Sequence, residues 1–295
     1  MNMSKSCLSL VIFLILGSMI SLPSFTNLVQ GQQSTNSSSS TTRNVTVLSN
    51  PAGNASQVEL RNNTVNYFDD ARGYLVYPAS SQENQSSNRS KLPAVIMIHE
   101  NKGLNEHIKN MANLLAKHGY VVLAVDLFKG EIATEQNDSR RLTQAVRSNP
   151  EIAINNLQSA VKYVSSLPNV NPSRIASMGW CFGGGQSLQL ALNSKDHPLA
   201  ATIVYYGTPL ITDNSNLSKI KWPVLGVFGD QDRAIPVEKV NQFKSTLNEL
   251  KIPNEIYIYK GVGHAFANPS GANYAPKETQ DAWEKTLSFL TKYLS

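Results

Sequence analysis

The chain has 295 residues, a formal charge of +5 and 41% hydrophobic residues. That length suffices for one sizeable α/β domain, and scattered lysines and arginines, without a basic run or interleaved aromatic residues, argue against a nucleic-acid-binding protein. The only two cysteines are Cys7 and Cys181, which excludes a domain built on many disulfide bonds.

The N-terminal segment has the pattern of an export signal. Lys5 precedes an apolar stretch over residues 8–20, and Ser-, Pro-, Asn- and Gln-rich sequence follows. We therefore predict a signal peptide over residues 1–31 and a secreted or extracytoplasmic protein. The apolar stretch is shorter than the roughly 18 residues expected of a spanning helix, so we expect membrane association only if the signal is retained as an uncleaved anchor.

Residues 32–61 are predicted to form a disordered spacer, because they contain few large apolar side chains that a fold could bury. Acceptor triplets for N-glycosylation predict a glycoprotein, although an Asn- and Ser-rich tract also generates such triplets freely. The triplets begin at Asn36, Asn44, Asn54, Asn62, Asn84, Asn88, Asn137 and Asn216.

Residues 62–295 are predicted to form one α/β domain. The runs 65–68 and 72–77 flank the turn-like pair Asp69–Asp70 and predict an antiparallel hairpin at a sheet edge. Continuous apolar runs, typical of strands buried on both faces, then alternate with helical patterns. The predicted strands are 94–98, 121–125, 175–178, 202–206, 224–228 and 256–259, and the predicted helices are 107–118, 152–165, 185–193, 238–250 and 277–293. The fold class is therefore α/β, with a doubly wound, mostly parallel sheet after the hairpin.

Cys181 lies at the predicted junction of a buried strand and a helix, within Gly-Trp-Cys-Phe-Gly-Gly-Gly. Glycines two residues before and two after it, Gly179 and Gly183, let the two backbones approach closely around a strained turn. The helix N-terminus would favour a thiolate, and the amide of Phe182 would point to a forming oxyanion. This pattern alone fits a buried structural cysteine equally well, since free cysteine is among the most buried residue types.

Two polar clusters follow later strands and favour a catalytic role for Cys181 over a structural one. His264 lies on a glycine-rich loop, and either Asp230 or Asp232 could orient its imidazole, although such aspartates also serve as turn residues. The carboxyl ends of parallel strands, where reactive side chains gather, lie at one edge of the sheet. The order cysteine, aspartate, histidine is that of α/β-hydrolases, which favours a catalytic role for Cys181.

Several motifs also carry a family resemblance: His99-Glu100 before Gly103, Asp126-Leu127-Phe128, the cysteine motif at 179–184, the aspartate motif at 229–236, and Gly263-His264-Ala265-Phe266. From about Leu75 to its end, the chain resembles the dienelactone hydrolase family, whose members are cysteine enzymes with the α/β-hydrolase fold. The resemblance implies that Cys181 is the nucleophile, His264 the base and acid, and Asp232 the orienting carboxylate.

The resemblance also implies roles for the residues that follow the first parallel strand. Glu100 would interact with the resting thiol and move away when substrate binds, which we interpret as gating that protects the thiol from oxidation. The backbone amides of Asn101 and Phe182 would form the oxyanion hole.

The chain departs from the family at the substrate-binding positions. Asn268 occupies the position where dienelactone-cleaving members have an arginine that holds the substrate carboxylate. Arg140 or Arg141 could align with a second substrate arginine, or both could be solvated helix charges.

We therefore predict an exported hydrolase that cleaves a small-molecule ester or lactone through an acyl-enzyme at Cys181. The alternative is a non-catalytic cell-surface binding module that keeps the fold. Redox chemistry at Cys181 is disfavoured, because the mature chain would have no resolving cysteine. We expect no cofactor, no metal ion, no nucleic-acid partner and a monomeric protein.

Overall fold

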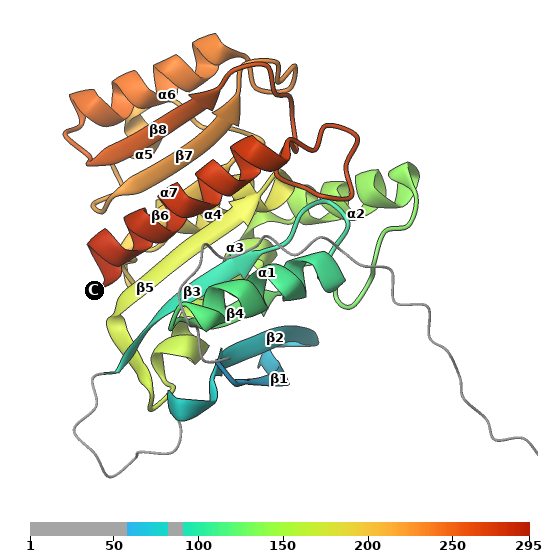
Figure 1. Ribbon diagram of the computed structural model, residues 1–295, viewed down its shortest axis with the longest axis vertical. Helices are drawn as coiled ribbons and strands as arrows, with labels where there is room; N and C mark the ends of the chain where they lie inside the picture. Colours follow the sequence, from blue (N-terminus) through green and yellow to red (C-terminus); the bar gives the residue numbers. More distant parts are fainter. Residues whose placement is uncertain (1–57, 82–90) are drawn as a thin grey trace, which may run out of the picture. The chain divides into compact units, whose positions relative to one another are not determined.

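The fold is built on one eight-stranded sheet. A computed structural model describes residues 58–81 and 91–295 of the chain. The strands are β1 (Leu60–Phe68), β2 (Ala71–Pro78), β3 (Leu92–Ile98), β4 (Val121–Val125), β5 (Val170–Trp180), β6 (Ala201–Tyr205), β7 (Val224–Gly229) and β8 (Asn254–Tyr259). Their order across the sheet is β1-β2-β4-β3-β5-β6-β7-β8 (Figure 1). The pairs β1–β2 and β2–β4 are antiparallel and the others are parallel, which confirms the predicted fold class and the edge hairpin.

Helices cover both faces of this sheet. They are α1 (Glu106–Lys117), α2 (Gln136–Ser148), α3 (Pro150–Ser165), α4 (Phe182–Leu192), α5 (Asn214–Leu217), α6 (Val237–Glu249) and α7 (Pro276–Leu294), with a short 3₁₀ turn, η1 (Ala79–Ser81). α1 and α7 lie in front of the sheet in Figure 1, and α3 and α4 lie behind it. All residues of β4 and β6 are buried as a result, which explains why these strands are continuous apolar runs.

Besides the short α5 and η1, which were not predicted, three elements differ from the sequence prediction. β5 begins at Val170 rather than near residue 175, and β1 begins at Leu60, two residues before the predicted domain boundary. α2 was not predicted, because most of its residues are polar and it buries only Ser139, Leu142 and Thr143. So polar a segment resembles a solvated loop in the sequence.

Tyr205, the last residue of β6, connects α7 to the backbone of Cys181. Its buried hydroxyl donates to the carbonyl of Ala282 at 2.9 Å and lies 2.7 Å from the hydroxyl of Thr286. Its own carbonyl accepts the amide N–H of Cys181 at 3.0 Å. The last helix is therefore held against the strand that neighbours the cysteine.

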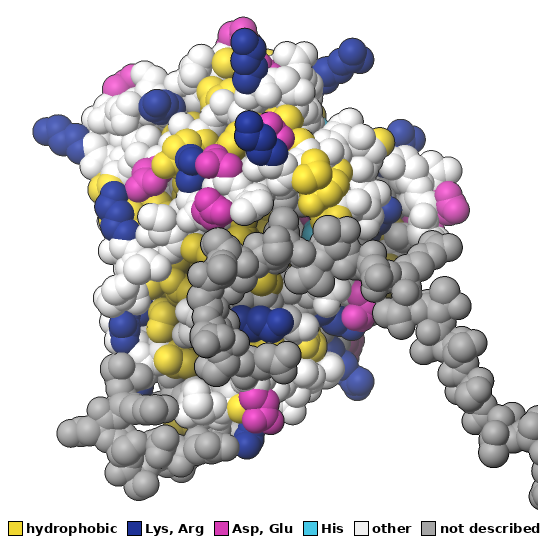
Figure 2. Space-filling model, in the orientation of Figure 1, with side chains coloured by type: hydrophobic (Ala, Val, Ile, Leu, Met, Phe, Trp, Pro, Cys, Tyr) yellow, Lys and Arg dark blue, Asp and Glu magenta, His cyan; other side chains and the backbone are white. Residues whose placement is uncertain are grey.

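The predicted signal peptide (1–31) and most of the predicted spacer lie outside the described residues. Within 58–81 and 91–295, no helix is both long enough and apolar enough to span a membrane. On the face shown in Figure 2, lysine and arginine side chains are dispersed, with acidic side chains among them.

Candidate active site

Cys181 occupies a strained turn between β5 and α4. Its φ is 54° and its ψ is −118°, a backbone conformation that side-chain-bearing residues rarely adopt. A Cβ on Gly179 would lie 2.3 Å from the carbonyl oxygen of Gly183, and a Cβ on Gly183 would lie 2.3 Å from the carbonyl oxygen of His99. The two glycines therefore allow the first turn of α4 to pack directly on the ends of β5 and β3. The turn presents the thiol at the carboxyl edge of the sheet.

The side chains of Cys181, His264 and Asp232 form a continuous chain of contacts. Nε2 of His264 lies 3.1 Å from Sγ of Cys181, and Nδ1 lies 2.7 Å from Oδ2 of Asp232. The Asp232 side chain is fully buried, whereas His264 is 25% exposed. The imidazole can therefore reach substrate and water, while its carboxylate partner is shielded from solvent.

Asp232, and not Asp230, is the acid that the structure brings to the imidazole. Oδ1 of Asp232 accepts the backbone N–H groups of Ala234 at 2.8 Å and Ile235 at 3.1 Å, which fixes the carboxylate. Asp230 instead accepts the N–H of Gly261 at 2.7 Å and holds the loop that carries the histidine. The pattern of residues left both aspartates open, and the family resemblance implied Asp232.

The contacts of His264 favour its protonated form. Burial is the largest single influence and opposes the imidazolium, but the contacts with Asp232 and Cys181 together outweigh it and raise the pKa of His264 to about 10. An imidazolium beside the sulfur favours the thiolate, the nucleophilic form of cysteine.

Glu100 lies beside this group but does not bond to the thiol here. Its Oε2 accepts a hydrogen bond from Nδ2 of Asn268, and its Oε1 accepts one from the hydroxyl of Tyr206 at 3.5 Å. Burial, only partly offset by Asn268, His264 and Tyr206, raises the pKa of Glu100 to about 7. His264, and not Glu100, contacts Cys181 in this structure. Gating of the thiol therefore stays a prediction, which requires a second position in which the Glu100 side chain reaches the thiol.

Tyr206 belongs to the site and was not found by sequence reasoning. It follows β6 with a φ of 34°, its ring is fully buried, and its ring centre lies 5.3 Å from that of His264. Burial, then the charges of Glu100 and Cys181, raise its pKa well above the ordinary value. In the sequence Tyr206 ends an apolar run and therefore looks like a core residue. The feature that could have indicated a role in the site was its position at the carboxyl end of a strand.

His99 fixes the peptide group that joins Glu100 to Asn101. Its Nε2 accepts the N–H of Leu127 at 3.1 Å, so the ring proton lies on Nδ1, which donates to the Glu100 carbonyl at 2.6 Å. The ring is completely buried, and burial lowers the pKa of His99, so it is neutral. The Asn101 N–H belongs to the same planar peptide and points the opposite way from this carbonyl.

The two arginines predicted as substrate contacts lie on α2. Arg141 forms an ion pair with Glu131 at 2.6 Å and lies 3.9 Å from Asp138, and Arg140 is exposed. The structure therefore places Arg141 in a surface ion pair, and a substrate role for either arginine stays a prediction.

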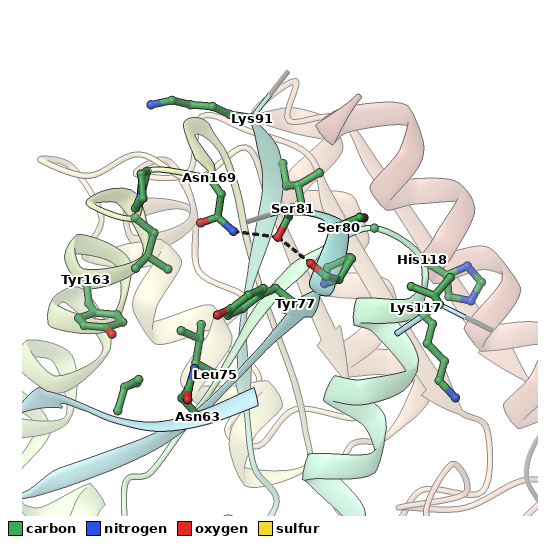
Figure 3. A pocket seen from close by; sticks show the side chains of 17 residues that line it. Asn63, Leu75, Tyr77, Ser80, Ser81, Lys91, Lys117, His118, Tyr163 and Asn169 are labelled. Atoms are coloured by element: carbon green, nitrogen blue, oxygen red, sulfur yellow. Dashed lines mark hydrogen bonds between the residues drawn. The ribbon is translucent and has the colours of Figure 1, made fainter. Parts of the chain in front are cut away.

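A cavity of about 730 Å³ lies at the opposite end of the sheet (Figure 3). Its walls include Tyr77 of β2, Tyr163 of α3 and Leu92, the first residue of β3. Glu100 follows the other end of β3, and a strand of seven residues spans about 23 Å. This cavity is therefore separate from the thiol.

Within residues 58–81 and 91–295, no group of three or more His, Cys, Asp and Glu side chains is arranged to hold a metal ion.

Residues 78–294 match the family model described as "Dienelactone hydrolase family". The chain belongs to the dienelactone hydrolase family. The match covers every residue of the site described above. This membership makes the protein a hydrolase of lactones or carboxylic esters.

Two curated relatives of this dienelactone hydrolase family protein illustrate that activity. One, assigned as a carboxymethylenebutenolidase of Saccharolobus solfataricus, is 31% identical over 236 residues, covering 68% of this chain and 89% of the relative. Another, of Bradyrhizobium, is assigned as a 2-oxo-3-(5-oxofuran-2-ylidene)propanoate lactonase and is 28% identical over 214 residues, covering 69% of this chain and 85% of the relative.

Solved structures share the fold of this family member. A dienelactone hydrolase-like promiscuous phosphotriesterase from metagenomic libraries superimposes with a TM-score of 0.70 at 21% identity, covering 80% of this chain and 99% of that chain. A dienelactone hydrolase from Anabaena variabilis gives a TM-score of 0.58 at 18% identity, with the same coverage of 80% and 99%.

Proposed function

We propose that this protein is an exported hydrolase that cleaves esters or lactones through a covalent acyl-enzyme on Cys181. The observation that carries the proposal is the unbroken series of contacts from the thiol through His264 to the buried carboxylate of Asp232. A nucleophile, a base within hydrogen-bond reach of it, and a third group that orients the base are what covalent acyl transfer requires.

In the first half of the reaction, the Cys181 thiolate attacks the acyl carbon and its carbonyl oxygen becomes an oxyanion. The amides of Asn101 and Phe182 donate to this oxygen. The tetrahedral intermediate then expels the alkoxide, which takes the proton of the His264 imidazolium and leaves as an alcohol. In a lactone the alcohol remains attached to the acyl group.

In the second half, water releases the acyl group. The neutral His264 imidazole takes a proton from a water molecule, and the resulting hydroxide attacks the thioester carbon. The C–S bond breaks, the acid departs, and the thiolate–imidazolium pair is restored. Asp232 stays ionised throughout and holds the imidazole in the required orientation.

Mass spectrometry of the protein with a panel of lactones and activated esters tests this proposal. Wild-type protein should gain the mass of the acyl group on the peptide that contains Cys181, with a burst of leaving group. Cys181→Ala should show neither, and Cys181→Ser should hydrolyse the panel far more slowly. If the wild type is folded but forms no adduct with any substrate, the binding-module alternative is favoured.

His99 gives a prediction about the oxyanion hole. His99→Leu removes the shorter of the two bonds to the Glu100 carbonyl and leaves the one from the Gly103 N–H at 3.3 Å. We expect kcat to fall by about 10-fold to 100-fold, less than the roughly 10²- to 10³-fold loss of a whole oxyanion donor. KM should change little, because the bond matters most when the oxyanion forms. Steady-state kinetics on the best panel substrate measures both constants.

His99→Gln and His118→Ala are the matched controls for that measurement. Glutamine keeps an N–H donor and should restore most of kcat. His118 follows α1 and lines the distant cavity, so His118→Ala should match the wild type. Equal losses in His99→Leu and His99→Gln would contradict the proposed orientation of the peptide.

Export is the part of the proposal that depends on residues 1–31. The sequence pattern there supports cleavage near residue 31. N-terminal sequencing of the protein recovered from its native source tests this, because a chain that begins at Met1 or Asn2 would show that the signal is retained.

A further inference from the structure

We propose that the acyl side of the substrate carries no negative charge, and that the Glu100 carboxyl, held in place by Asn268, discriminates against a carboxylate there. This inference rests on the proposed function and specifies its substrate class. It comes from the placement of one buried carboxyl beside the thiol and imidazole.

Asn268 holds Glu100 in a defined position. Its Oδ1 accepts the backbone N–H of Ser270 at 2.9 Å, which leaves Nδ2 to donate to Oε2 of Glu100. The Asn268 amide itself donates to the carbonyl of Ala265, one residue after the histidine, at 3.0 Å. The turn that carries His264 therefore also fixes the carboxyl.

Glu100 is close enough to the reacting groups to affect a bound acyl group. Its Oε1 accepts the Tyr206 hydroxyl at 3.5 Å, and the ring centre of Tyr206 lies 5.3 Å from that of His264. The residue is only 7% exposed, so water screens its charge poorly. A second carboxylate on the acyl group would lie near a buried one.

No strong cation near Glu100 compensates for that repulsion within the described residues. Of the groups that act on Glu100, Lys102 has the weakest influence, and its side chain is exposed. The other cation, the His264 imidazolium, is already paired with Asp232 and Cys181. Asn268 is neutral, and its Nδ2 donates to Glu100.

The discrimination should depend on pH with a defined sign. The pKa of Glu100 is about 7, so the carboxyl is mostly neutral at pH 6 and mostly ionised at pH 8. His264 and Tyr206, which face it, do not titrate in this range, because their pKa values are raised to about 10 and well above 10. Lys102 is the remaining charged neighbour of Glu100. Rejection of anions should therefore strengthen from pH 6 to pH 8.

Alkylation of Cys181 tests the electrostatics without requiring hydrolysis. Iodoacetamide and iodoacetate differ chiefly in charge, and their rates are followed on the peptide that contains Cys181 at pH 8. Glu100→Gln should shift the rate ratio toward iodoacetate by about 10-fold, and Asn268→Arg should shift it further. The ratio cancels changes in thiol reactivity. Glu284→Gln, which removes an exposed carboxylate on α7, should leave the ratio unchanged.

Hydrolysis of a matched ester pair tests the substrate class. p-Nitrophenyl valerate and p-nitrophenyl hydrogen glutarate have acyl chains of equal length, and only the second carries a carboxylate. Wild type should prefer valerate in kcat/KM, and Glu100→Gln should reduce that preference by about 10-fold.

The two measurements separate failure of this inference from failure of the proposed function. If wild type hydrolyses both esters but Glu100→Gln changes neither ratio, the inference is overturned and the function stands. If no ester is hydrolysed yet the alkylation ratio shifts as expected, the proposed function fails while the electrostatic selection stands. A wild-type preference for the glutarate ester at pH 8 would also overturn the inference.

Discussion

Asp232→Asn is expected to lower kcat by about 10⁴-fold, although the substitution changes almost no volume. The carboxylate accepts the Nδ1 proton of His264 at 2.7 Å, and its other oxygen is fixed by two backbone N–H groups. In asparagine the oxygen would keep those backbone bonds, and the NH₂ group would face Nδ1. Such an amide favours the tautomer protonated on Nε2, which cannot accept a proton from Cys181. Steady-state hydrolysis of the best panel substrate measures the loss.

Asp230→Asn is the matched control, two residues away in the same loop. Asparagine there retains an oxygen that can accept the Gly261 N–H, so kcat should stay within about threefold of wild type. The fraction of folded protein is compared by circular dichroism. A large loss in Asp230→Asn with near-normal activity in Asp232→Asn would reverse the assignment of the acid.

Glu100→Gln is expected to make stability less dependent on pH. Folding raises the pKa of Glu100 from 4.5 to about 7, so the folded protein binds this proton more tightly than the unfolded chain. The contribution to stability is fully present below pH 4.5 and is lost as pH rises through about 7. The loss is about 3 kcal/mol in the free energy of unfolding. Glutamine does not titrate, so the variant should gain most of that amount relative to wild type between pH 5 and pH 8.

Urea unfolding at pH 5 and pH 8 measures this gain as a change between two conditions. Any hydrogen bond that glutamine makes differently contributes equally at both pH values and cancels. Glu284→Gln on the exposed face of α7 should show the wild-type pH dependence. An identical pH dependence in wild type and Glu100→Gln would mean that Glu100 does not hold its proton in the folded protein.

The parallel part of the sheet was predictable because its strands are buried on both faces. β4 and β6 appear in the sequence as five-residue apolar runs, and the structure gives them as Val121–Val125 and Ala201–Tyr205. α2 was missed because most of its residues are polar, so its narrow apolar stripe was not recognised as a helical pattern.

The candidate site was predictable where it depends on order along the chain. Cys181, Asp232 and His264 each follow a strand, and parallel strands bring such positions to one edge of the sheet. The structure brings the three side chains together. Their catalytic roles are what the Asp232 variant tests. The contact between Glu100 and Asn268 joins residues 168 positions apart, and neither belongs to a pattern that specifies a partner. Tyr206 was missed because an aromatic residue that ends an apolar run looks like core.

The bonds of Tyr205 also set an order of events during synthesis. Its hydroxyl needs Ala282 and Thr286, both in the last helix, while its carbonyl fixes the amide of Cys181. His264 likewise comes 83 residues after Cys181 in the sequence. A partly synthesised chain can therefore contain the thiol before the imidazole that contacts it and before the helix that braces its strand. The contacts around Cys181 are complete only after α7 has been made.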